Sequence, residues 1–240
     1  VALREWAGLV FLSTAAEPPE LRGDVPLSTL GNWPMERLVT GHRWEKTLAC
    51  NWKVFWENYS ECLHCPGIHP ELCDMVPVYR EGVMAENERQ DWTPEMPRGP
   101  HLKDGAASWT MSGAPCGPIF PGLTPDERQA GYTFVTIWPS VFVVAHVDYV
   151  RSVRLEPLGP GQTRLVAEWH FAPETLAQPG FRPESVADFA KVVLMQDGDA
   201  CEMNQRGMAS PAYQRGRLMP EEYAIHRFHD WILREIEVSP

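Results

Sequence analysis

Residues 131–171 read GYTFVTIWPSVFVVAHVDYVRSVRLEPLGPGQTRLVAEWHF and form the most regular stretch of the chain. Four runs in it are rich in β-branched and aromatic residues: 132–138, 141–147, 149–155 and 163–171. Pro139-Ser140 follows the first run, and Gly159-Pro160-Gly161 precedes the last. Consecutive strands joined by tight turns pair in antiparallel order, so this stretch predicts a meander of four strands.

The segments outside the meander predict helices and two further strands. Residues 182–184 (Arg-Pro-Glu) open a long helix, because the first turn tolerates proline and its dipole favours an acid. A last helix is expected over 220–236, and strands over 6–13 and 38–49. Residues 76–121, rich in proline, glycine and methionine, are expected to be mostly loop with short strands that rim a pocket. A meander flanked by helices predicts the α+β class.

The charge balance of the 240 residues limits the partners. The chain has 21 basic and 32 acidic residues, which gives a net charge of −11 at pH 7. Such a chain repels phosphate backbones and anionic lipids, so we expect no nucleic-acid and no membrane partner. The chain has neither a long apolar run nor a signal-peptide pattern, so we expect a cytoplasmic protein. Its first residue is Val1 rather than Met, which suggests that it begins inside a longer protein.

The cysteines favour reduced thiols over secreted disulfides. Four of them lie within residues 50–73, next to histidines, and no export signal is seen. We therefore expect buried thiols or a metal site. The six are Cys50, Cys62, Cys65, Cys73, Cys116 and Cys201.

The candidate chemistry lies in residues 51–70, NWKVFWENYSECLHCPGIHP. Residues 51–62 predict a helix whose apolar side holds Trp52, Phe55, Trp56, Tyr59 and Leu63. Its other side holds Glu57, Asn58, Glu61 and His64, and the ordinary alternative is that this polar side simply faces water. We expect His64 in the last turn and His69 on the segment that folds back after the helix-breaking Pro66-Gly67. Both imidazoles would then reach one point.

A carboxylate from the long helix would complete a metal site. Two imidazoles and one carboxylate suit Fe(II) and leave positions open for dioxygen. Residues 196–207 read QDGDACEMNQRG, and three acids in an otherwise apolar helix are costly to bury without a cation or donors. The residue pattern alone leaves Asp197 and Asp199 both open as the ligand.

These two stretches resemble the catalytic-domain signature of Rieske-type non-haem iron oxygenases, the large subunits of ring-hydroxylating and related oxygenases. In the first stretch the matching residues are Asn51-Trp52-Lys53, Glu57-Asn58-Tyr59, Glu61, His64, Cys65-Pro66 and His69-Pro70. In the second they are Gln196-Asp197, Glu202 and Gln205-Arg206-Gly207. Residues 6–11 resemble the exit strand of the family's N-terminal cluster domain.

The resemblance implies a role for each matching residue. His64, His69 and Asp197 would bind a mononuclear Fe(II), with Asp199 as the competing carboxylate. Glu61 would be the bridging acid toward the [2Fe–2S] cluster of a neighbouring subunit. Glutamate at this position is similar to the branch that acts on quaternary amines, namely choline monooxygenase, carnitine oxygenase and glycine betaine demethylase. The ten tryptophans are compatible with an aromatic cage for trimethylammonium, although such side chains fill cores more often.

The resemblance also implies an assembly larger than this chain. The family's cluster domain carries C-x-H and C-x-x-H, and this sequence has no C-x-x-H. We therefore expect residues 1–35 to be a remnant of that domain with its linker, and residues 36–240 to be the mononuclear iron catalytic domain. The family implies a sheet wrapped around the long C-terminal helix (the helix-grip architecture of START and Bet v 1-like proteins) and a homotrimer. It also implies a reductase or ferredoxin that donates electrons. The implied reaction uses dioxygen to hydroxylate or N-demethylate a quaternary amine or an aromatic acid.

The pocket is expected between the sheet and the long helix. Asn58 and Glu57 are candidate partners for the histidines. Some strand residues would face the pocket, with plain core packing as the alternative; the candidates are Trp138, Phe142, His146, Trp169 and Phe171.

Two other functions remain open at this point. A metal-free helix-grip module that binds an apolar molecule predicts that His64, His69 and Asp197 are dispersed. A zinc-stabilised structural domain would use cysteines and a histidine, namely Cys62, Cys65, His69 and Cys73.

Overall fold

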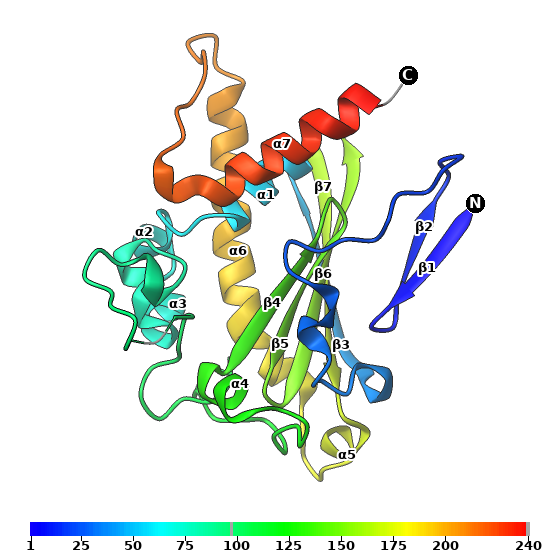
Figure 1. Ribbon diagram of the computed structural model, residues 1–240, viewed down its shortest axis with the longest axis vertical. Helices are drawn as coiled ribbons and strands as arrows, with labels where there is room; N and C mark the ends of the chain where they lie inside the picture. Colours follow the sequence, from blue (N-terminus) through cyan, green and yellow to red (C-terminus); the bar gives the residue numbers. More distant parts are fainter. Residues whose placement is uncertain (97, 239–240) are drawn as a thin grey trace. The chain divides into compact units, whose positions relative to one another are not determined.

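The computed structural model describes residues 1–96 and 98–238, with side chains up to residue 236 (Figure 1). The chain divides into two compact units. The first consists of residues 1–45, 105–155 and 166–188, and the second of the remaining described residues. Four elements run from one unit into the other. They are the strands β3 (Val39–Leu48), β6 (Tyr149–Gly159) and β7 (Gln162–Phe171) and the helix α6 (Pro183–Met208).

A five-stranded sheet is ordered β3–β7–β6–β5–β4 along its hydrogen-bonded neighbours. Strand β4 (Tyr132–Ile137) pairs antiparallel with β5 (Val141–His146), and β5 pairs antiparallel with β6. The predicted meander and the predicted strand over 38–49 are therefore confirmed, and with them a mixed fold of helices and antiparallel strands.

Strand β5 lies in the core of the first unit, and all six of its residues are buried. Val135 of β4, Val143 of β5 and Val150 of β6 belong to one apolar cluster, as expected for β-branched side chains on a covered sheet face. The ring of His146 stacks on Tyr149 with centroids 4.3 Å apart. Of the five side chains considered for a pocket wall, only Trp138 is partly exposed; the other four are 0–1% exposed, as core packing predicts.

The chain opens with a hairpin instead of the single strand expected over 6–13. Strand β1 (Ala2–Trp6) pairs with β2 (Leu9–Ser13), and the two residues between them have φ of 53° at Ala7 and 78° at Gly8. Two positive φ values in a two-residue loop match the twist of a hairpin. The sequence pattern missed the turn because alanine rarely adopts this conformation.

Short helices fill the connections. They are η1 (Leu27–Leu30), η2 (Met35–Arg37), η3 (Pro77–Glu81), η4 (Glu86–Glu88), α4 (Pro125–Ala130), α5 (Pro173–Leu176) and η5 (Pro220–Glu222). The short strands expected over 76–121 are absent from the described part of that segment, so this detail was wrong.

The second unit is mainly helical. Its helices are α1 (Trp52–Tyr59), α2 (Cys65–Ile68), α3 (Pro70–Met75), most of α6 and α7 (Tyr223–Val238). The predicted long helix and last helix are both present. Helices α1 and α7 meet through aromatic rings, with the Trp52 and Phe228 centroids 6.0 Å apart.

No helix within the described residues is both long and apolar enough to cross a lipid bilayer.

Candidate metal centre

Helix α1 ends earlier than the sequence pattern predicts. It begins at the cap Asn51, whose side chain accepts a hydrogen bond from the Lys53 amide at 3.0 Å, and it ends at Tyr59. The Glu61 carboxylate accepts hydrogen bonds from the backbone amides of Leu63 and His64. Such side-chain bonds favour a turn over further helix.

Because α1 ends early, His64, Pro66 and Leu63 do not lie where the sequence pattern predicts. His64 precedes α2 and is not in the last turn of α1, and His69 lies between α2 and α3. Pro66, expected to stop a helix, lies in the first turn of α2, where its missing N–H costs nothing. Leu63, expected on the apolar side of α1, is 44% exposed.

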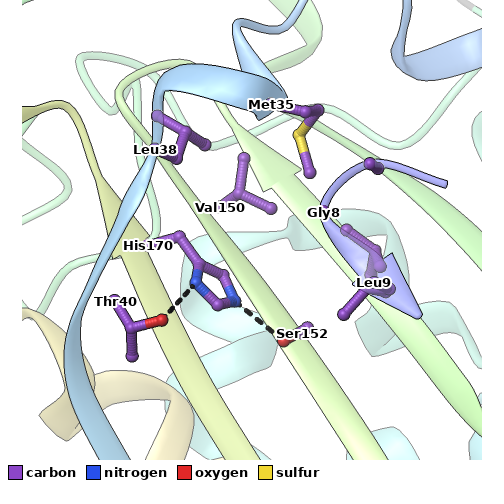
Figure 2. A pocket seen from close by; sticks show the side chains of 10 residues that line it. Gly8, Leu9, Met35, Leu38, Thr40, Val150, Ser152 and His170 are labelled. Atoms are coloured by element: carbon purple, nitrogen blue, oxygen red, sulfur yellow. Dashed lines mark hydrogen bonds between the residues drawn. The ribbon is translucent and has the colours of Figure 1, made fainter. Parts of the chain in front are cut away.

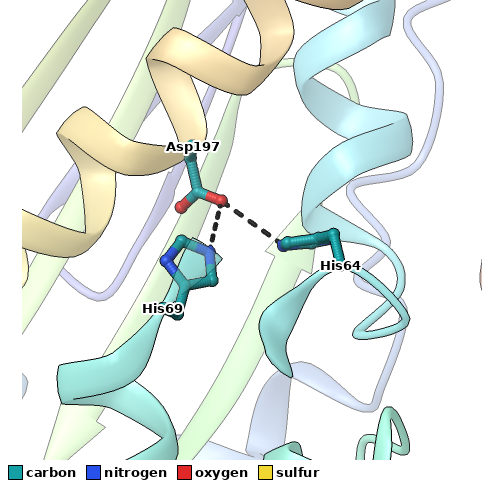
Figure 3. A group of neighbouring side chains, drawn as sticks. All are labelled: His64, His69 and Asp197. Carbon is teal, nitrogen blue, oxygen red and sulfur yellow. Dashed lines mark hydrogen bonds and ion pairs between the residues drawn. The ribbon is translucent and has the colours of Figure 1, made fainter. Parts of the chain in front are cut away.

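The structure nevertheless brings His64, His69 and Asp197 together (Figure 3). Asp197 comes from the middle of α6, and one ligand atom from each residue lies within 4.8 Å of the others. Asp197 Oδ1 is 3.0 Å from His69 Nε2 and 3.6 Å from His64 Nε2. The side chains are mostly covered, with exposed fractions of 19% for His64, 1% for His69 and 14% for Asp197.

The other carboxylates of α6 turn away from this point. Residues 197 and 199 are separated by about 200° around a helix, so both cannot face one centre. The side chain of Asp199 is 72% exposed and lies 3.4 Å from Lys46 Nζ. Glu202 accepts a hydrogen bond from the Ala49 amide at 3.0 Å.

Hydrogen bonds fix the orientation of His69. Gln196 Nε2 donates to Glu71 Oε2 at 2.8 Å, so Gln196 Oε1 remains as the acceptor facing the imidazole. His69 Nδ1–H then donates to this oxygen at 2.8 Å, and Nε2, 3.0 Å from Asp197 Oδ1, is the nitrogen that remains for a metal. The residue pattern alone indicated no role for Gln196 or Glu71. The only signal for Glu71 was its place two residues after His69.

His64 and Asp197 have partners of their own. The Glu61 carboxylate accepts a hydrogen bond from His64 Nδ1–H, which leaves Nε2 for a metal. Asn58 Nδ2 donates to Asp197 Oδ1 at 2.6 Å, as a predicted outer partner should. Glu57, the other candidate, is not near the centre, because its Oε1 contacts His229 Nε2 at 2.8 Å.

The electrostatics of the metal-free site couple these groups. Burial alone would lower the pKa of His64, but hydrogen bonds to Asp197 and Glu61 outweigh it and raise that pKa to about 9. Burial would raise the pKa of Asp197, yet the two histidines hold it well below its usual range. The Asp197 carboxylate thus stays ionised between two imidazoles. A divalent cation could take the place of the protons that lie between these groups.

The donor set fits a ferrous ion. Two imidazole nitrogens and one carboxylate oxygen converge from separate segments, as in the facial triads of non-haem Fe(II) oxygenases. The metal-free alternative predicted that these three residues are dispersed, and they are not.

The structure corrects the expectation that all cysteines are reduced. Cys62 and Cys65 form a disulfide, so they cannot serve as the thiolate ligands that the zinc alternative requires. Cys73 remains a free, buried thiol whose Sγ–H donates to the Cys65 carbonyl at 3.4 Å. The prediction of reduced thiols rested on the expected cellular compartment. That argument does not exclude a disulfide between two cysteines that a local turn brings together.

A separate cavity of about 140 Å³ lies in the first unit (Figure 2). Its polar wall is His170, whose ring nitrogens contact Thr40 Oγ1 at 3.0 Å and Ser152 Oγ at 2.8 Å. The rest of the wall is mainly apolar, with Leu9, Met35, Leu38, Val143 and Val150. Because both ring nitrogens are engaged, His170 is not placed as a metal ligand.

Comparison with known proteins identifies the family. Residues 35–237 match the model of the ring-hydroxylating alpha subunit, catalytic domain. The chain belongs to this family. Members carry a mononuclear Fe(II) in this domain and a [2Fe–2S] centre in an N-terminal domain, which agrees with the donor set found here.

Curated relatives of this family member are longer oxygenase chains. The glycine betaine monooxygenase oxygenase subunit of Chromohalobacter salexigens is 27% identical, over 96% of this chain and 58% of its own length. The chloroplastic choline monooxygenase of Beta vulgaris is 29% identical, over 80% of this chain and 38% of its own. The chain therefore spans between about two fifths and three fifths of these relatives.

Solved structures show the same fold. The quaternary ammonium Rieske monooxygenase CntA, in complex with an inhibitor, superposes with a TM-score of 0.65 at 18% identity, covering 97% of this chain and 60% of CntA. Naphthalene 1,2-dioxygenase from Rhodococcus sp. gives a TM-score of 0.55 at 14% identity, covering 100% and 67%.

Proposed function

We propose that this chain is the mononuclear iron domain of an oxygenase that hydroxylates or N-demethylates a small quaternary amine. The observation that carries the proposal is the convergence of His64, His69 and Asp197, whose ligand atoms lie within 4.8 Å of one another. Fe(II) bound there would supply activation of dioxygen, with coordination positions left open by the three protein ligands.

The protein's own part is to orient and insulate this centre. Glu61 and Gln196 each hold a proton on the Nδ1 atom of one histidine, so Nε2 is the ring atom that each histidine would offer to the metal. Asn58 holds the Asp197 carboxylate. Glu61 lies on the side of His64 away from Asp197, which supports the role of bridging acid that the family resemblance gives it.

The proposal extends from the metal centre to the organisation of the chain. Residues 1–35 would be the exit strand and linker of a [2Fe–2S] domain, and residues 36–240 the catalytic domain. A cytoplasmic homotrimer in which a neighbour's cluster delivers electrons from a reductase or ferredoxin fits the resemblance. A sheet that wraps around α6 in a helix-grip arrangement is part of the same proposal.

The names of the relatives support a quaternary amine as substrate. Glycine betaine and choline appear in the names of the two curated relatives cited above. Glu61, which resembles the acid of that branch, points the same way.

Iron content and oxygen uptake test the proposal. The whole oxygenase, purified without air and supplied with its reductase, should hold one mononuclear iron per chain and consume oxygen with glycine betaine, choline or carnitine, but not with benzoate. His64→Ala should lose that iron and the uptake, whereas His226→Ala, at an exposed histidine, should keep both. Iron that persists in His64→Ala would contradict the proposed site, and uptake with benzoate alone would contradict the substrate class.

The role of Glu61 has its own test. Glu61→Gln keeps a hydrogen-bond acceptor near His64 Nδ1 but removes the charge, so iron should stay bound while turnover falls by about 100-fold or more. Metal analysis and oxygen uptake on the same preparation measure the two effects. Unchanged turnover would remove Glu61 from the electron path.

A further inference from the structure

The Cys62–Cys65 disulfide brackets His64 in the sequence, and one of its sulfurs reaches toward the metal centre. Cys65 Sγ lies 3.9 Å from His64 Nε2, the ring nitrogen that faces Asp197 Oδ1 at 3.6 Å. The same nitrogen therefore has a carboxylate oxygen and a sulfur at similar distances. A zinc-bound nitrogen and sulfur, at about 2.1 Å and 2.3 Å from the ion with a tetrahedral angle, are about 3.6 Å apart.

The disulfide contributes little as a structural staple. Its sequence separation is 3, and short closed loops restrict the unfolded chain least. The helices on either side have other anchors, since α1 packs on α7 through Trp52 and Phe228, and the Cys73 thiol holds the Cys65 carbonyl. Leu63, inside the loop, is 44% exposed, so the loop lies at the surface even though the sulfurs are covered.

We propose that the Cys62–Cys65 pair is a thiol–disulfide switch in which reduction turns Cys65 into a fourth, sulfur ligand of the metal centre. The inference rests on the proposed metal centre. In the oxidised form Cys65 Sγ is bonded to Cys62, and the centre keeps three protein ligands with open positions. In the reduced form a His–His–Asp–Cys set closes a tetrahedral site, which suits Zn²⁺ better than a ferrous oxygenase centre.

The redox step balances with ordinary reagents. A dithiol reductant breaks the S–S bond by exchange, becomes a cyclic disulfide, and leaves two thiols on the protein, which has gained two electrons and two protons. Binding of Cys65 to a divalent ion then releases its thiol proton to solvent. In the reverse direction hydrogen peroxide takes the two electrons, one proton from the Cys62 thiol and one proton from solvent, and leaves as two molecules of water, and the S–S bond forms again.

Cobalt provides a readout independent of activity. The protein is stripped of mononuclear metal, treated or not with a phosphine reductant, desalted without air and titrated with Co²⁺. Difference spectra against metal-free protein report visible bands for bound cobalt and a near-ultraviolet charge-transfer band for a sulfur ligand. The sulfur band should appear only after reduction, with an accompanying increase of about tenfold or more in cobalt affinity.

Three variants sharpen the test. Cys62→Ser leaves Cys65 permanently free, so it should show the sulfur band without reductant. Cys65→Ser should bind cobalt without that band in either condition. Cys73→Ala, which removes a neighbouring buried thiol outside the pair, should behave like the unaltered protein.

The outcomes separate the switch from the proposed function. Cobalt that binds in both redox forms and depends on Asp197, but never shows the sulfur band, would overturn the switch and leave the iron site standing. Two thiols that do not appear on phosphine treatment, by mass spectrometry after alkylation, would overturn it as well. Cobalt binding that is absent, or insensitive to Asp197→Ala, would overturn the proposed function together with the switch.

Discussion

At His69 a single amide decides which ring nitrogen is available to a metal. Gln196 is oriented by Glu71, and this orientation makes its oxygen the acceptor for His69 Nδ1–H. The ring is 1% exposed, so no water competes for that proton. The Nδ1 proton of His69 is thus held in place, and Nε2, which faces Asp197, is the nitrogen left for an ion.

Replacing Gln196 tests this orientation. Gln196→Leu should weaken Fe(II) binding by about 10- to 100-fold, the range typical of partners that orient a metal ligand. Equilibrium dialysis without air measures the affinity. Gln205→Leu, on the same helix but bonded to the Asn51 amide, is the matched control and should leave the affinity unchanged. Equal effects of the two variants would contradict a specific role for Gln196.

The two acids of α6 give a second comparison. Asp197→Ala should reduce iron affinity by more than about 100-fold, because a ligand matters more than an outer partner. Asp199→Ala removes only an exposed contact with Lys46, so iron content should stay close to that of the unaltered protein. Metal analysis of both variants checks this, and the reverse order would reassign the ligand.

At the scale of the element, α6 passes close to β3 at the point where it presents Asp197. Gly198 has no side chain, and a Cβ added there would lie 2.8 Å from Leu48 Cδ2. Leu48 is 1% exposed, so its methyl group has little room to retreat. The glycine permits the close approach that sets the depth of the carboxylate.

Alanine at this position should therefore destabilise the protein, even though alanine favours helices by about 1 kcal/mol over glycine. We expect Gly198→Ala to lower the free energy of unfolding by about 1–2 kcal/mol through overpacking. Gly207→Ala, in the same helix with nothing within 4 Å of the added carbon, should raise it by up to about 1 kcal/mol. Urea unfolding of both variants measures the difference in the free energy of unfolding. A higher value in both variants would show that Leu48 moves aside at little cost.

At the scale of the whole molecule, buried histidines of the first unit make stability depend on pH. Burial and the nearby Arg151 hold the pKa of His146 well below its ordinary value. Burial also lowers the pKa of His170, with Glu168 opposing the shift. Both rings are neutral when folded, whereas in the unfolded chain they take up protons as the pH falls through about 6.5. Stability present above that pH is therefore lost on acidification.

Unfolding at two pH values checks this sign. The urea midpoint should fall between about pH 7.5 and pH 5.5, and His146→Phe should make the fall shallower because one proton uptake is removed. His226→Gln, at an exposed histidine, should leave the pH dependence as it was. A midpoint that rises on acidification would show that other groups dominate.

The parts of the fold that could be predicted from sequence were those with a strong local signal. The strands over 132–171 follow from dense β-branched runs with turns between them, and α6 begins at the expected Pro183. The site was predicted as a set of residues but with the wrong local structure. Hydrogen bonds from backbone amides to Glu61 end α1 early, and a wheel drawn from residue spacing cannot show them.

The remaining site details depend on contacts between distant residues. Residue spacing alone left Asp197 and Asp199 open, and only their opposite directions on α6 distinguish them. The roles of Gln196 and Glu71 depend on which amide atom faces which neighbour. The Cys62–Cys65 bond depends on a turn that the helical pattern did not predict.

The alternation of the two units along the chain has a consequence for how this family can diverge. Each unit is assembled from three segments that alternate, so five junctions join them. A unit cannot be exchanged between relatives as a block by one recombination event, and no single protease cut releases it intact. Exchange of one whole unit would therefore need crossovers at all five junctions.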